Sequence, residues 1–296
     1  MAGIQKEQQP NNTEMKAKLI TLVPEAIQHD SYSKGSCDFS VTEILKPPQQ
    51  TSLALDNEPR DLGEYKNLAS WVGTAVHEQL EKYGREHYPD AIHEERLLYY
   101  FEVNGRKVTL GGKPDTLHPE QRVIQDYKCV KEGGLPKDNE PKYDHYWQAQ
   151  FNSYLARRNQ IEIDFFQIDY IGIDWRQKPF AKIEDVPWKP VVGTILPDSE
   201  ILPRLMIHLE AHVNAKLGKA RECTDVERWM KPSVYAVKKK GAKRSRKNCS
   251  SEIEARQHMK PGDEVEFRQG EYTRCERFCD YSNSCPQFKW SKIKSK

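Results

Sequence analysis

Two carboxylates and a lysine near the middle of the chain have the types and spacing needed for phosphodiester hydrolysis. Asp115 and Asp126 are separated by ten residues, enough for two adjacent strands joined by a turn. Lys128 follows Asp126 by two positions, so on a strand both side chains lie on the same face. Carboxylates bind Mg²⁺ or Mn²⁺, which lowers the pKa of a bound water, and an ammonium group can position that water. The alternative is a surface hairpin with an ion pair.

The context of these residues is more informative than the short pattern itself. Pro-Asp pairs also occur at residues 89–90 and 197–198. Only Asp115 and the triplet 126–128 lie on successive strand-like runs, and Gly111 and Gly112 before them allow a close backbone approach.

The surrounding elements indicate a mixed α/β domain. Apolar residues recur at helical spacing in three segments, residues 65–86, 143–158 and 200–219. Alternating or β-branched runs predict strands at residues 96–103, 107–111, 123–130, 161–173 and 265–267. Asn104-Gly105 predicts a tight hairpin turn, and residues 179–197 are expected to be irregular. The order helix, strands, helix, strand is typical of a mixed α/β fold.

Polar residues on the first two helices are further candidates. His77 lies one turn after Gly73, and a lone helical histidine is more often a hydrogen-bonded structural residue than a ligand. Glycine inside a helix costs about 1 kcal/mol relative to alanine, which a close approach of another backbone or of a substrate would explain. Gln150 and Tyr154 share a helical face, which is compatible with ordinary packing, although a buried amide must be hydrogen-bonded.

Four motifs in a fixed order resemble those of RecB-type nucleases of the PD-(D/E)XK superfamily. They are Gly73-x3-His77, Gly112-x2-Asp115, Asp126-Tyr127-Lys128 and Gln150-x3-Tyr154, with a literal Pro114-Asp115. The resemblance covers roughly residues 37–285 and implies a restriction-endonuclease-like fold, with a mixed central sheet flanked by helices. It implies metal ligands at His77, Asp115, Asp126 and the Tyr127 carbonyl, and a catalytic lysine at Lys128. Gln150 and Tyr154 would orient Lys128, the attacking water or the DNA phosphate.

The seven cysteines are an odd number for a disulfide framework, and the chain lacks secretory features. Cys275, Cys279 and Cys285 crowd the end of the chain, and Cys37 precedes the core. Four thiolates suit either zinc or a 4Fe–4S cluster. Cys129, Cys223 and Cys249 match no role.

This arrangement of cysteines resembles the iron–sulfur subgroup of these nucleases, which includes the AddB nuclease domain and the CRISPR-adaptation exonucleases. The resemblance implies a structural 4Fe–4S cluster that joins the N- and C-terminal segments. The first gap between the C-terminal cysteines here is three residues, where the subgroup has two. Zinc is the alternative metal, and free cysteines in a reducing cytosol are the alternative without one.

Residues 231–247 contain eight basic residues and no acidic one. Such a run is compatible with a solvated loop or with an arm that contacts phosphates. The resemblance favours a DNA-backbone arm, with Tyr235 or Trp229 available for base stacking. Its candidate contacts are Lys238, Lys239, Lys240, Lys243, Arg244, Arg246 and Lys247. No base-reading motif is apparent, so we expect little sequence preference.

Composition narrows the class of protein. With 37% hydrophobic, 30% charged and 10% aromatic residues, the chain is neither disordered nor collagen-like. It has no run of 18 apolar residues and no signal-peptide core at its start, so we expect an intracellular protein without a membrane span. The resemblance implies a bacterial cytoplasm, or the host cell of a bacterial virus. We expect a polar segment 1–30, then one domain 31–296 that includes the basic arm 231–247 and a cysteine segment 271–296.

These observations together predict a metal-dependent DNA exonuclease that acts on ends or single strands, in recombination or end processing. No Gly-x4-Gly-Lys-Ser/Thr motif is present, so ATP-driven unwinding would need a helicase or recombination partner. One alternative is a non-catalytic nucleic-acid-binding protein that retains the nuclease fold as a scaffold. Another is a zinc-stapled binding module that uses the basic arm.

Overall fold

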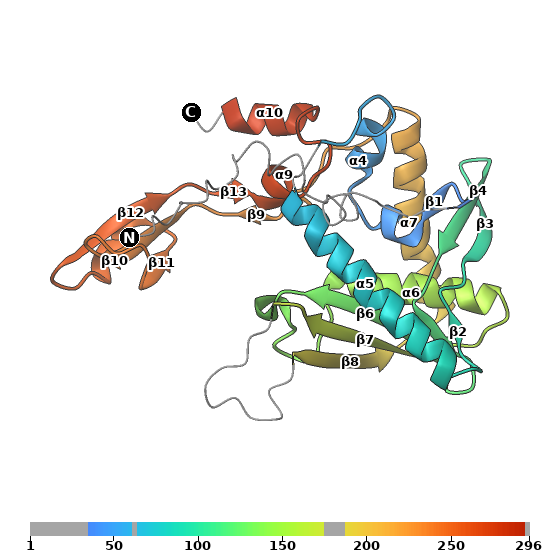
Figure 1. Cartoon of the computed structure of the whole chain (residues 1–296). Coiled ribbons are helices and arrows are strands. Elements are labelled where there is room, and N and C mark those ends of the chain that lie inside the picture. The colour runs from blue at the N-terminus through green and yellow to red at the C-terminus, as the bar shows by residue number, and fades with distance from the viewer. Residues whose placement is uncertain (1–34, 61–63, 175–186, 294–296) are drawn as a thin grey trace, which may run out of the picture.

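The computed structural model describes residues 35–60, 64–174 and 187–293, and a mixed sheet of five strands lies at its centre (Figure 1). The predicted polar segment 1–30 lies outside these residues. The strand order is β2-β5-β6-β7-β8. The strands are β2 Ile92–His93, β5 Thr116–His118, β6 Val123–Val130, β7 Phe165–Gly172 and β8 Trp188–Thr194. β6 and β7 run parallel, and the other neighbours are antiparallel.

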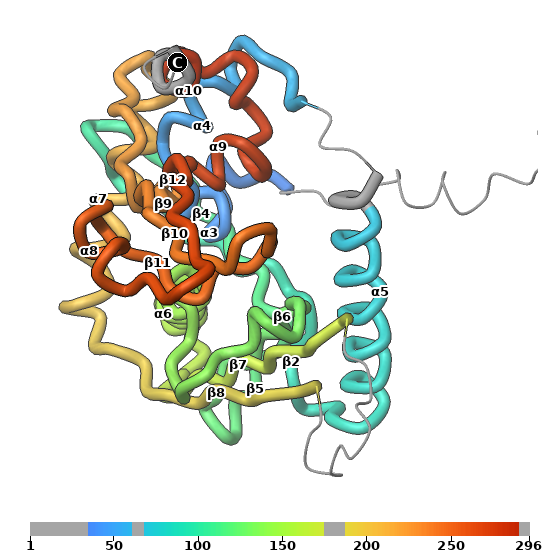
Figure 2. The backbone as a smooth tube through the Cα atoms, turned by 90° about the vertical axis from the view of Figure 1, so that its left-hand side faces the viewer, coloured from blue at the N-terminus to red at the C-terminus, as the bar shows by residue number. Residues whose placement is uncertain are grey.

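Two long helices cover opposite faces of this sheet (Figure 2). Helix α6 (Tyr143–Arg158), which follows the short 3₁₀ helix η1 (Glu132–Gly134), is the crossover that the parallel strands β6 and β7 require. Helix α5 (Glu64–His87) packs on the other face. Because side chains alternate along β6, Asp126 faces α6, where Gln148 contacts it, and Tyr127 faces α5, where His77 contacts it.

A second sheet, with the order β1-β4-β3, continues the body. Its strands are β1 Phe39–Ser40, β3 Leu97–Val103 and β4 Arg106–Gly112. Asn104 and Gly105 join β3 to β4 with φ angles of 52° and 72°, as a two-residue hairpin turn with two positive φ angles requires. The predicted hairpin is therefore confirmed. β1 pairs in parallel with β4 and places the start of the described chain beside the end of that strand.

Helix α7 (Asp198–Lys216) is tied to two short helices, α3 (Val41–Ile44) and α4 (Pro48–Leu53), through buried histidines. The Nδ1 atom of His212 lies 2.8 Å from Oγ1 of Thr51, and its Nε2 atom lies 3.1 Å from the carbonyl oxygen of Lys46. Nδ1 of His208 lies 2.9 Å from the carbonyl oxygen of Ile44. Polar side chains thus fasten the N-terminal turns to the core.

The predicted helices and strands are confirmed, apart from one segment. Residues 179–197 were expected to be irregular, but Trp188–Thr194 forms β8. Pro190 lies inside this strand, and an edge strand tolerates proline because only one of its sides pairs, here with β7. The prolines in this segment therefore explain why the sequence pattern did not predict a strand at the sheet edge. Residues 179–186 of the segment lie outside the described part of the chain.

The predicted basic run belongs to a β-structured arm that projects from the body in Figure 1. A sheet of order β11-β10-β12 forms it, from β10 Val234–Lys239, β11 Lys247–Cys249 and β12 Asp263–Arg268, with helix α8 Glu252–Gln257. At its base β9 Met230–Lys231 pairs with β13 Glu271–Tyr272. Two helices follow, α9 Thr273–Arg277 and α10 Pro286–Ile293. In the described ranges, the helices are too short or too polar to span a bilayer.

Burial of His212 gives a prediction for stability against pH. Burial, assisted by the nearby charge of His208 and opposed by the bond to Lys46, lowers the pKa of His212 to about 4. The unfolded chain, with its ordinary histidine pKa near 6.5, binds the proton more tightly, so stability falls as pH drops from 6.5 toward 4. This linkage amounts to about 2 kcal/mol at pH 5.

We expect His212→Gln to have a lower melting temperature than wild type at pH 7.5, because the buried bonds of the imidazole are weakened. The variant should nevertheless lose less stability than wild type between pH 7.5 and pH 5. Thermal melts of both proteins across this range measure the difference. An equal loss in the two proteins contradicts the assignment to His212.

Candidate active site

Of the two predicted carboxylates, Asp115 lines a cavity of about 710 Å³ between α5, the end of β4 and the strand β6, and Asp126 forms an ion pair with the lining residue Lys128. His77 and Gly73 come from α5, and Lys128 from β6. Asp115 lies directly before β5. Residues far apart in the chain therefore meet in one concave site, as the motif order predicts.

Asp115 is buried and holds the centre of this site together. One of its carboxylate oxygens lies 3.2 Å from Nδ1 of His77, and the other accepts a 2.5 Å hydrogen bond from the backbone N–H of Tyr127. Burial favours the neutral acid, but the bond to His77 and the charge of Lys128 outweigh it and lower the pKa of Asp115. The carboxyl group is therefore an anion at neutral pH, as a metal ligand must be.

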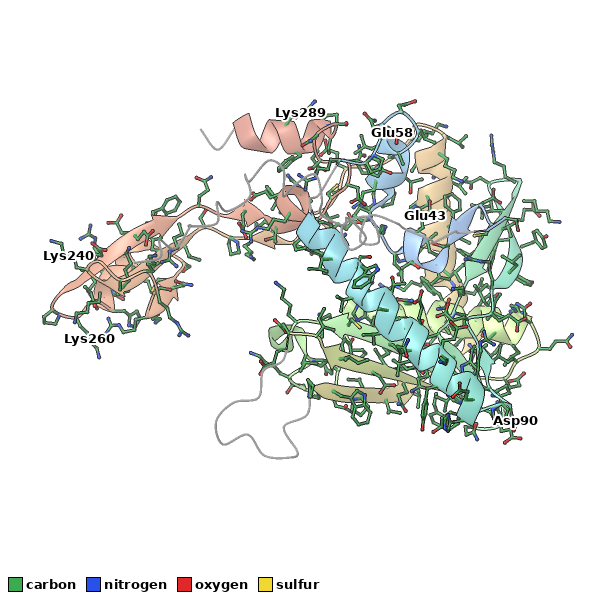
Figure 3. The ribbon with its side chains drawn as sticks, viewed as in Figure 1. Glu43, Glu58, Asp90, Lys240, Lys260 and Lys289 are labelled. Atoms are coloured by element: carbon green, nitrogen blue, oxygen red, sulfur yellow. The ribbon has the colours of Figure 1, made fainter. Side chains whose placement is uncertain are left out.

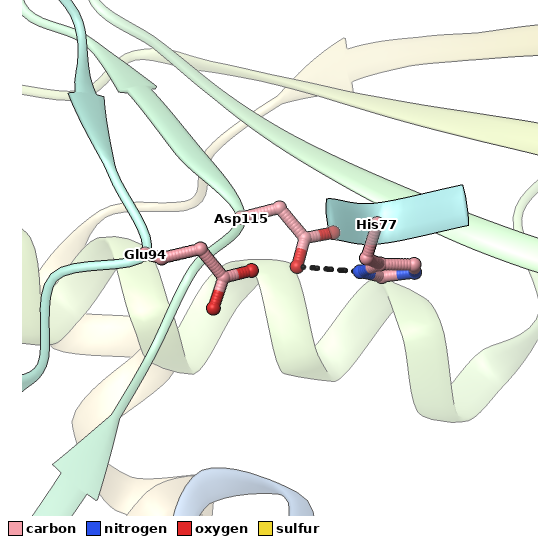
Figure 4. Close-up of side chains that lie close together, drawn as sticks. All are labelled: His77, Glu94 and Asp115. Atoms are coloured by element: carbon pink, nitrogen blue, oxygen red, sulfur yellow. Dashed lines mark ion pairs between the residues drawn. The ribbon is translucent and has the colours of Figure 1, made fainter. Parts of the chain in front are cut away.

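Glu94 joins His77 and Asp115 in a group whose ligand atoms all lie within 4.8 Å of one another (Figure 4). Its backbone φ angle is 54°, a conformation that costs a residue with a side chain about 1–3 kcal/mol. A 3.0 Å bond from the Glu94 N–H to the Asp115 carbonyl and an ion pair with Lys113 hold it there. One imidazole and two carboxylates suit Mn²⁺ or Mg²⁺.

The sequence analysis missed Glu94. It lies outside the four motifs, and the pairing of β2 with β5 brings it beside Asp115. Its neighbour Glu95 is exposed, so acidic character alone did not distinguish the two positions.

Asp126 and Lys128 form an ion pair on the face of β6 that is turned to α6, as the strand periodicity predicts. Nε2 of Gln148 donates to the other oxygen of Asp126 at 3.2 Å. Burial, with the charge of Asp115, raises the pKa of Asp126 to about 6 despite Lys128. Burial also disfavours charged Lys128, but Asp126 and Asp115 outweigh it and raise the pKa of Lys128. The cavity thus concentrates negative charge that a cation would neutralise.

Gly73 occupies the wall of the cavity. Within the described part of the chain, a Cβ atom at this position would meet only Cβ of Cys129, at an ordinary 3.9 Å. The sequence analysis explained Gly73 by a close approach either of another backbone or of a substrate. The first explanation is therefore wrong. The glycine leaves room on the cavity side of α5.

Gln150 and Tyr154 lie elsewhere than the resemblance implies. Nε2 of Gln150 donates to the carbonyl oxygen of Thr194 at 3.2 Å, and Oε1 accepts from the Leu196 N–H at 2.9 Å. Tyr154 stacks with Phe101 in the core, with ring centroids 6.1 Å apart. Helix α6 is buried over most of its length, so apolar periodicity did not reveal which face meets the site. That face carries Gln148 and Asn152, one helical turn apart.

Three members of the predicted four-cysteine set lie near one another in the C-terminal segment. Cys275 and Cys285 pack against Phe288 in one apolar cluster, and the charges of both thiols reach Cys279. Cys37 lies against β4, where a Cβ atom at Gly111 would come within 2.7 Å of its sulfur. The pairing of β1 with β4 determines this position of Cys37.

The basic run is partly neutralised by a strand that the sequence analysis did not pair with it. β12 lies antiparallel to β10, so Lys238 pairs with Glu264 and Glu266. The remaining pairs join Arg246 to Asp263 and Lys247 to Glu254. Exposed cations around the turn after β10 are Lys239, Lys240, Lys243 and Arg244, and Figure 3 shows Lys240 at the far end of the arm.

A family model described as the PD-(D/E)XK nuclease superfamily matches residues 40–286, and the chain belongs to this superfamily. A search of curated proteins gave no match.

Solved structures of low similarity include three that cover 49% to 74% of the chain. The crystal structure of SSO0001 is 15% identical and covers 74% of this chain and 92% of its own, with a TM-score of 0.45. A phage related exonuclease from Haemophilus somnus 129PT is 19% identical, covers 49% and 68%, and has a TM-score of 0.34. LHK-Exo in complex with dAMP is 12% identical, covers 60% and 92%, and has a TM-score of 0.33.

The geometry predicts that Glu94 contributes to metal affinity. We expect Glu94→Gln to weaken Mn²⁺ binding at least about tenfold in calorimetric titrations, because one anionic donor is lost. Without metal, the same variant should melt no lower than wild type, since a buried charge is removed from an acidic cavity. Glu95→Gln is the matched control and should bind Mn²⁺ like wild type. Equal affinity in all three proteins would exclude Glu94 as a ligand.

Proposed function

We propose that this protein is a metal-dependent DNA exonuclease that hydrolyses phosphodiester bonds at ends or in single strands. The observation that carries the proposal is the convergence of His77, Glu94 and Asp115 in one cavity that is also lined by Lys128, the ion-pair partner of Asp126. Membership of the PD-(D/E)XK superfamily supports hydrolysis as the reaction. A non-catalytic scaffold would have no need of this costly set of buried charges.

The donor set fits Mg²⁺ or Mn²⁺. His77, Asp115 and Glu94 would hold the ion, with Asp126 and the Tyr127 carbonyl as the remaining protein oxygens proposed from the motifs. When bound, such an ion supplies a water of lowered pKa and offsets charge on the phosphate. The charge of Asp115 helps to raise the pKa of Asp126, and a bound cation would relieve this repulsion between the two carboxylates.

Lys128 acts as a cation in this proposal. Its raised pKa, which the Asp126 and Asp115 carboxylates produce against the effect of burial, keeps the ammonium protonated at neutral pH. It therefore cannot remove a proton from water, but it can donate hydrogen bonds to the attacking water or to the phosphate oxygens as negative charge develops. Gln148 fixes the orientation of Asp126, and Asp126 in turn places the ammonium. Gln148 thus takes the orienting role that the motifs gave to Gln150 and Tyr154.

Catalysis is tested by digestion of end-labelled DNA with Mn²⁺. We expect Asp126→Ala and Lys128→Gln each to reduce cutting by at least about 100-fold, because each removes charge that contacts the reacting groups. Asp90→Ala alters an exposed carboxylate beyond α5 and should cut like wild type (Figure 3).

Equal cutting by wild type and Asp126→Ala contradicts the assignment. The mode of attack is tested with linear and circular single strands of the same sequence, since an exonuclease degrades only the linear form. Cutting of both forms at one rate would leave a nuclease but exclude an exonuclease.

We propose that the arm contacts the DNA backbone during end processing in recombination, where a helicase partner would supply single strands. The four exposed cations around its far turn, Lys239, Lys240, Lys243 and Arg244, support this role best. Lys238, Arg246 and Lys247 also lie in the predicted run, but their charges are shared with carboxylates of the arm.

Replacing the four exposed cations by alanine should weaken binding to single-stranded DNA. The dependence of log affinity on log salt should fall by up to about 3, since fewer counterions are released. Lys238→Ala is the control, because Glu264 and Glu266 already neutralise this lysine. Fluorescence anisotropy at several salt concentrations measures both. An unchanged salt slope in the fourfold variant means that DNA does not follow the arm.

We also propose that Cys37 and the three C-terminal cysteines hold a 4Fe–4S cluster with a structural role, in preference to zinc. Three thiols that lie close together in a poorly solvated pocket support the proposal. Thiolates are the ligands that both kinds of centre use.

A further inference from the structure

Asn152 is a buried amide on the wall of the active-site cavity, and the fold leaves it without a hydrogen bond. It lies on α6 one turn after Gln148, and both residues line the cavity. Asn152 is only 2% exposed, and in the described part of the chain neither end of its amide has a partner. An unpaired buried polar group costs free energy, because it has lost its bonds to water. The fold alone therefore gives no reason for an amide at this position.

The other two side-chain amides of α6 are used by the fold. Nε2 of Gln148 donates to Asp126. Gln150 is bonded at both ends, to the carbonyl oxygen of Thr194 and to the N–H of Leu196. Asparagine is also a poorer helix former than leucine. A buried, unpaired asparagine in the middle of this helix is thus unfavourable for folding, and a ligand that uses the amide would explain it.

A glycine opposite Asn152 makes room for the amide. A Cβ atom at Gly112 would come within 2.3 Å of Oδ1 of Asn152 and within 2.8 Å of Cδ1 of Leu155. Gly112 ends β4 and lies three residues before Asp115, which is at the centre of the proposed metal site. The first residue of the motif Gly112-x2-Asp115 therefore lets an amide of α6 reach the segment that carries Asp115.

The amide can present either of its ends. Because neither end is bonded to the protein, a half-turn about the Cβ–Cγ bond exchanges Oδ1 and Nδ2 without breaking a hydrogen bond. As a donor, the nitrogen offers two N–H groups and no charge. A cationic side chain here would be attracted to Asp115 and Asp126 and would compete with a metal ion for them. An uncharged donor can bind an anion in this cavity and leave both carboxylates available.

We propose that the Asn152 amide donates a hydrogen bond to a non-bridging phosphate oxygen of the DNA strand bound in the cavity. The inference rests on the proposed function, since it takes DNA as the molecule that enters the cavity. A phosphate oxygen is present at every nucleotide whatever the base, and asparagine is one of the side chains that contact it. The acceptor is charged, which makes this bond stronger than one between neutral groups. Binding of the strand then satisfies the amide that folding leaves unpaired.

Asn152 and Lys128 would hold the strand from two different elements. Lys128 comes from β6 and Asn152 from α6, and both line the same cavity. Gln148 connects them, because it lies one turn before Asn152 and donates to Asp126, the ion-pair partner of Lys128. One helix face therefore carries both the amide that binds the strand and the amide that positions the carboxylate. Phosphate contacts of this kind fix the register of a strand and carry no sequence information.

The test separates DNA binding from stability with variants of Asn152, all made in the Asp126→Ala protein, which the proposed function predicts to cut poorly. Asn152→Leu keeps the approximate shape and removes both polar atoms, so it should melt no lower than the parent. In anisotropy titrations with Mn²⁺, it should bind a short fluorescent single strand at least about tenfold more weakly, since a bond to a charged acceptor is lost. Asn152→Asp has the same shape but offers a carboxylate to the phosphate, and should bind more weakly still.

Ser153→Ala is the matched control. Ser153 is the next residue of α6 and its Oγ atom is also buried without a partner, but it does not line the cavity in the described chain. This variant should melt no lower than the parent and bind the strand equally well. Parent-like affinity of both Asn152 variants overturns the proposal. A lower melting temperature of Asn152→Leu also overturns it, because the amide would then serve the fold.

Strands with a single methylphosphonate test the contact itself. This group replaces one non-bridging oxygen by a methyl group and so removes one acceptor. At one position along the strand, we expect the replacement to weaken binding of the parent and to have little further effect on Asn152→Leu. Equal losses in the two proteins at every position would exclude the contact.

Failure of this contact and failure of the proposed reaction are distinguishable. Gel analysis of the same titration samples shows whether the Asp126→Ala protein cuts the strand. Cutting at the wild-type rate contradicts the proposed reaction, whereas the affinities alone decide the contact of Asn152.

Discussion

The structure depends on one electrostatic constraint, the gathering of three carboxylates and their basic partners at one cavity. Asp115, Asp126 and Glu94 are drawn together although burial opposes the charge of each. Lys128, Lys113 and His77 compensate in part. Removing Lys128 would leave the buried charge of Asp126 without compensation, which costs more than the pair contributes. The ionisable groups at the cavity therefore stabilise one another and form a single interacting unit.

The secondary structure is arranged to hold that unit. β5 pairs with only three residues of β6, so Asp115 can turn and accept from the Tyr127 N–H. Helices α5 and α6 then approach from opposite faces and contribute His77 and Gln148. The positive φ angle of Glu94 shows that backbone strain is retained here, where it positions a charged group. A rigid scaffold of this kind would present a bound ion and a protonated ammonium to the same phosphate.

Much of this could be predicted from the sequence, because local patterns determine it. Helix α6 begins and ends at the predicted residues, and Asn104-Gly105 forms the expected turn. Asp115, Asp126 and Lys128 meet because strand periodicity and turn length are local properties. The position of Glu94 depends on the pairing of β2 with β5, which joins segments that are distant in the sequence. Such long-range contacts leave no periodic signal in the sequence. Helix α6 is buried over most of its length, so its apolar pattern also does not show whether Gln148 or Gln150 faces the site.

The central claim is that the imidazole of His77 and the carboxylates of Asp115 and Glu94 bind one divalent ion. Anomalous diffraction from crystals soaked in Mn²⁺ tests it most directly. The account predicts a manganese peak within about 2.0–2.6 Å of one ligand atom from each of the three residues. A cavity that stays free of manganese at saturating concentration, or a peak bound to other side chains while these three turn away, would contradict it.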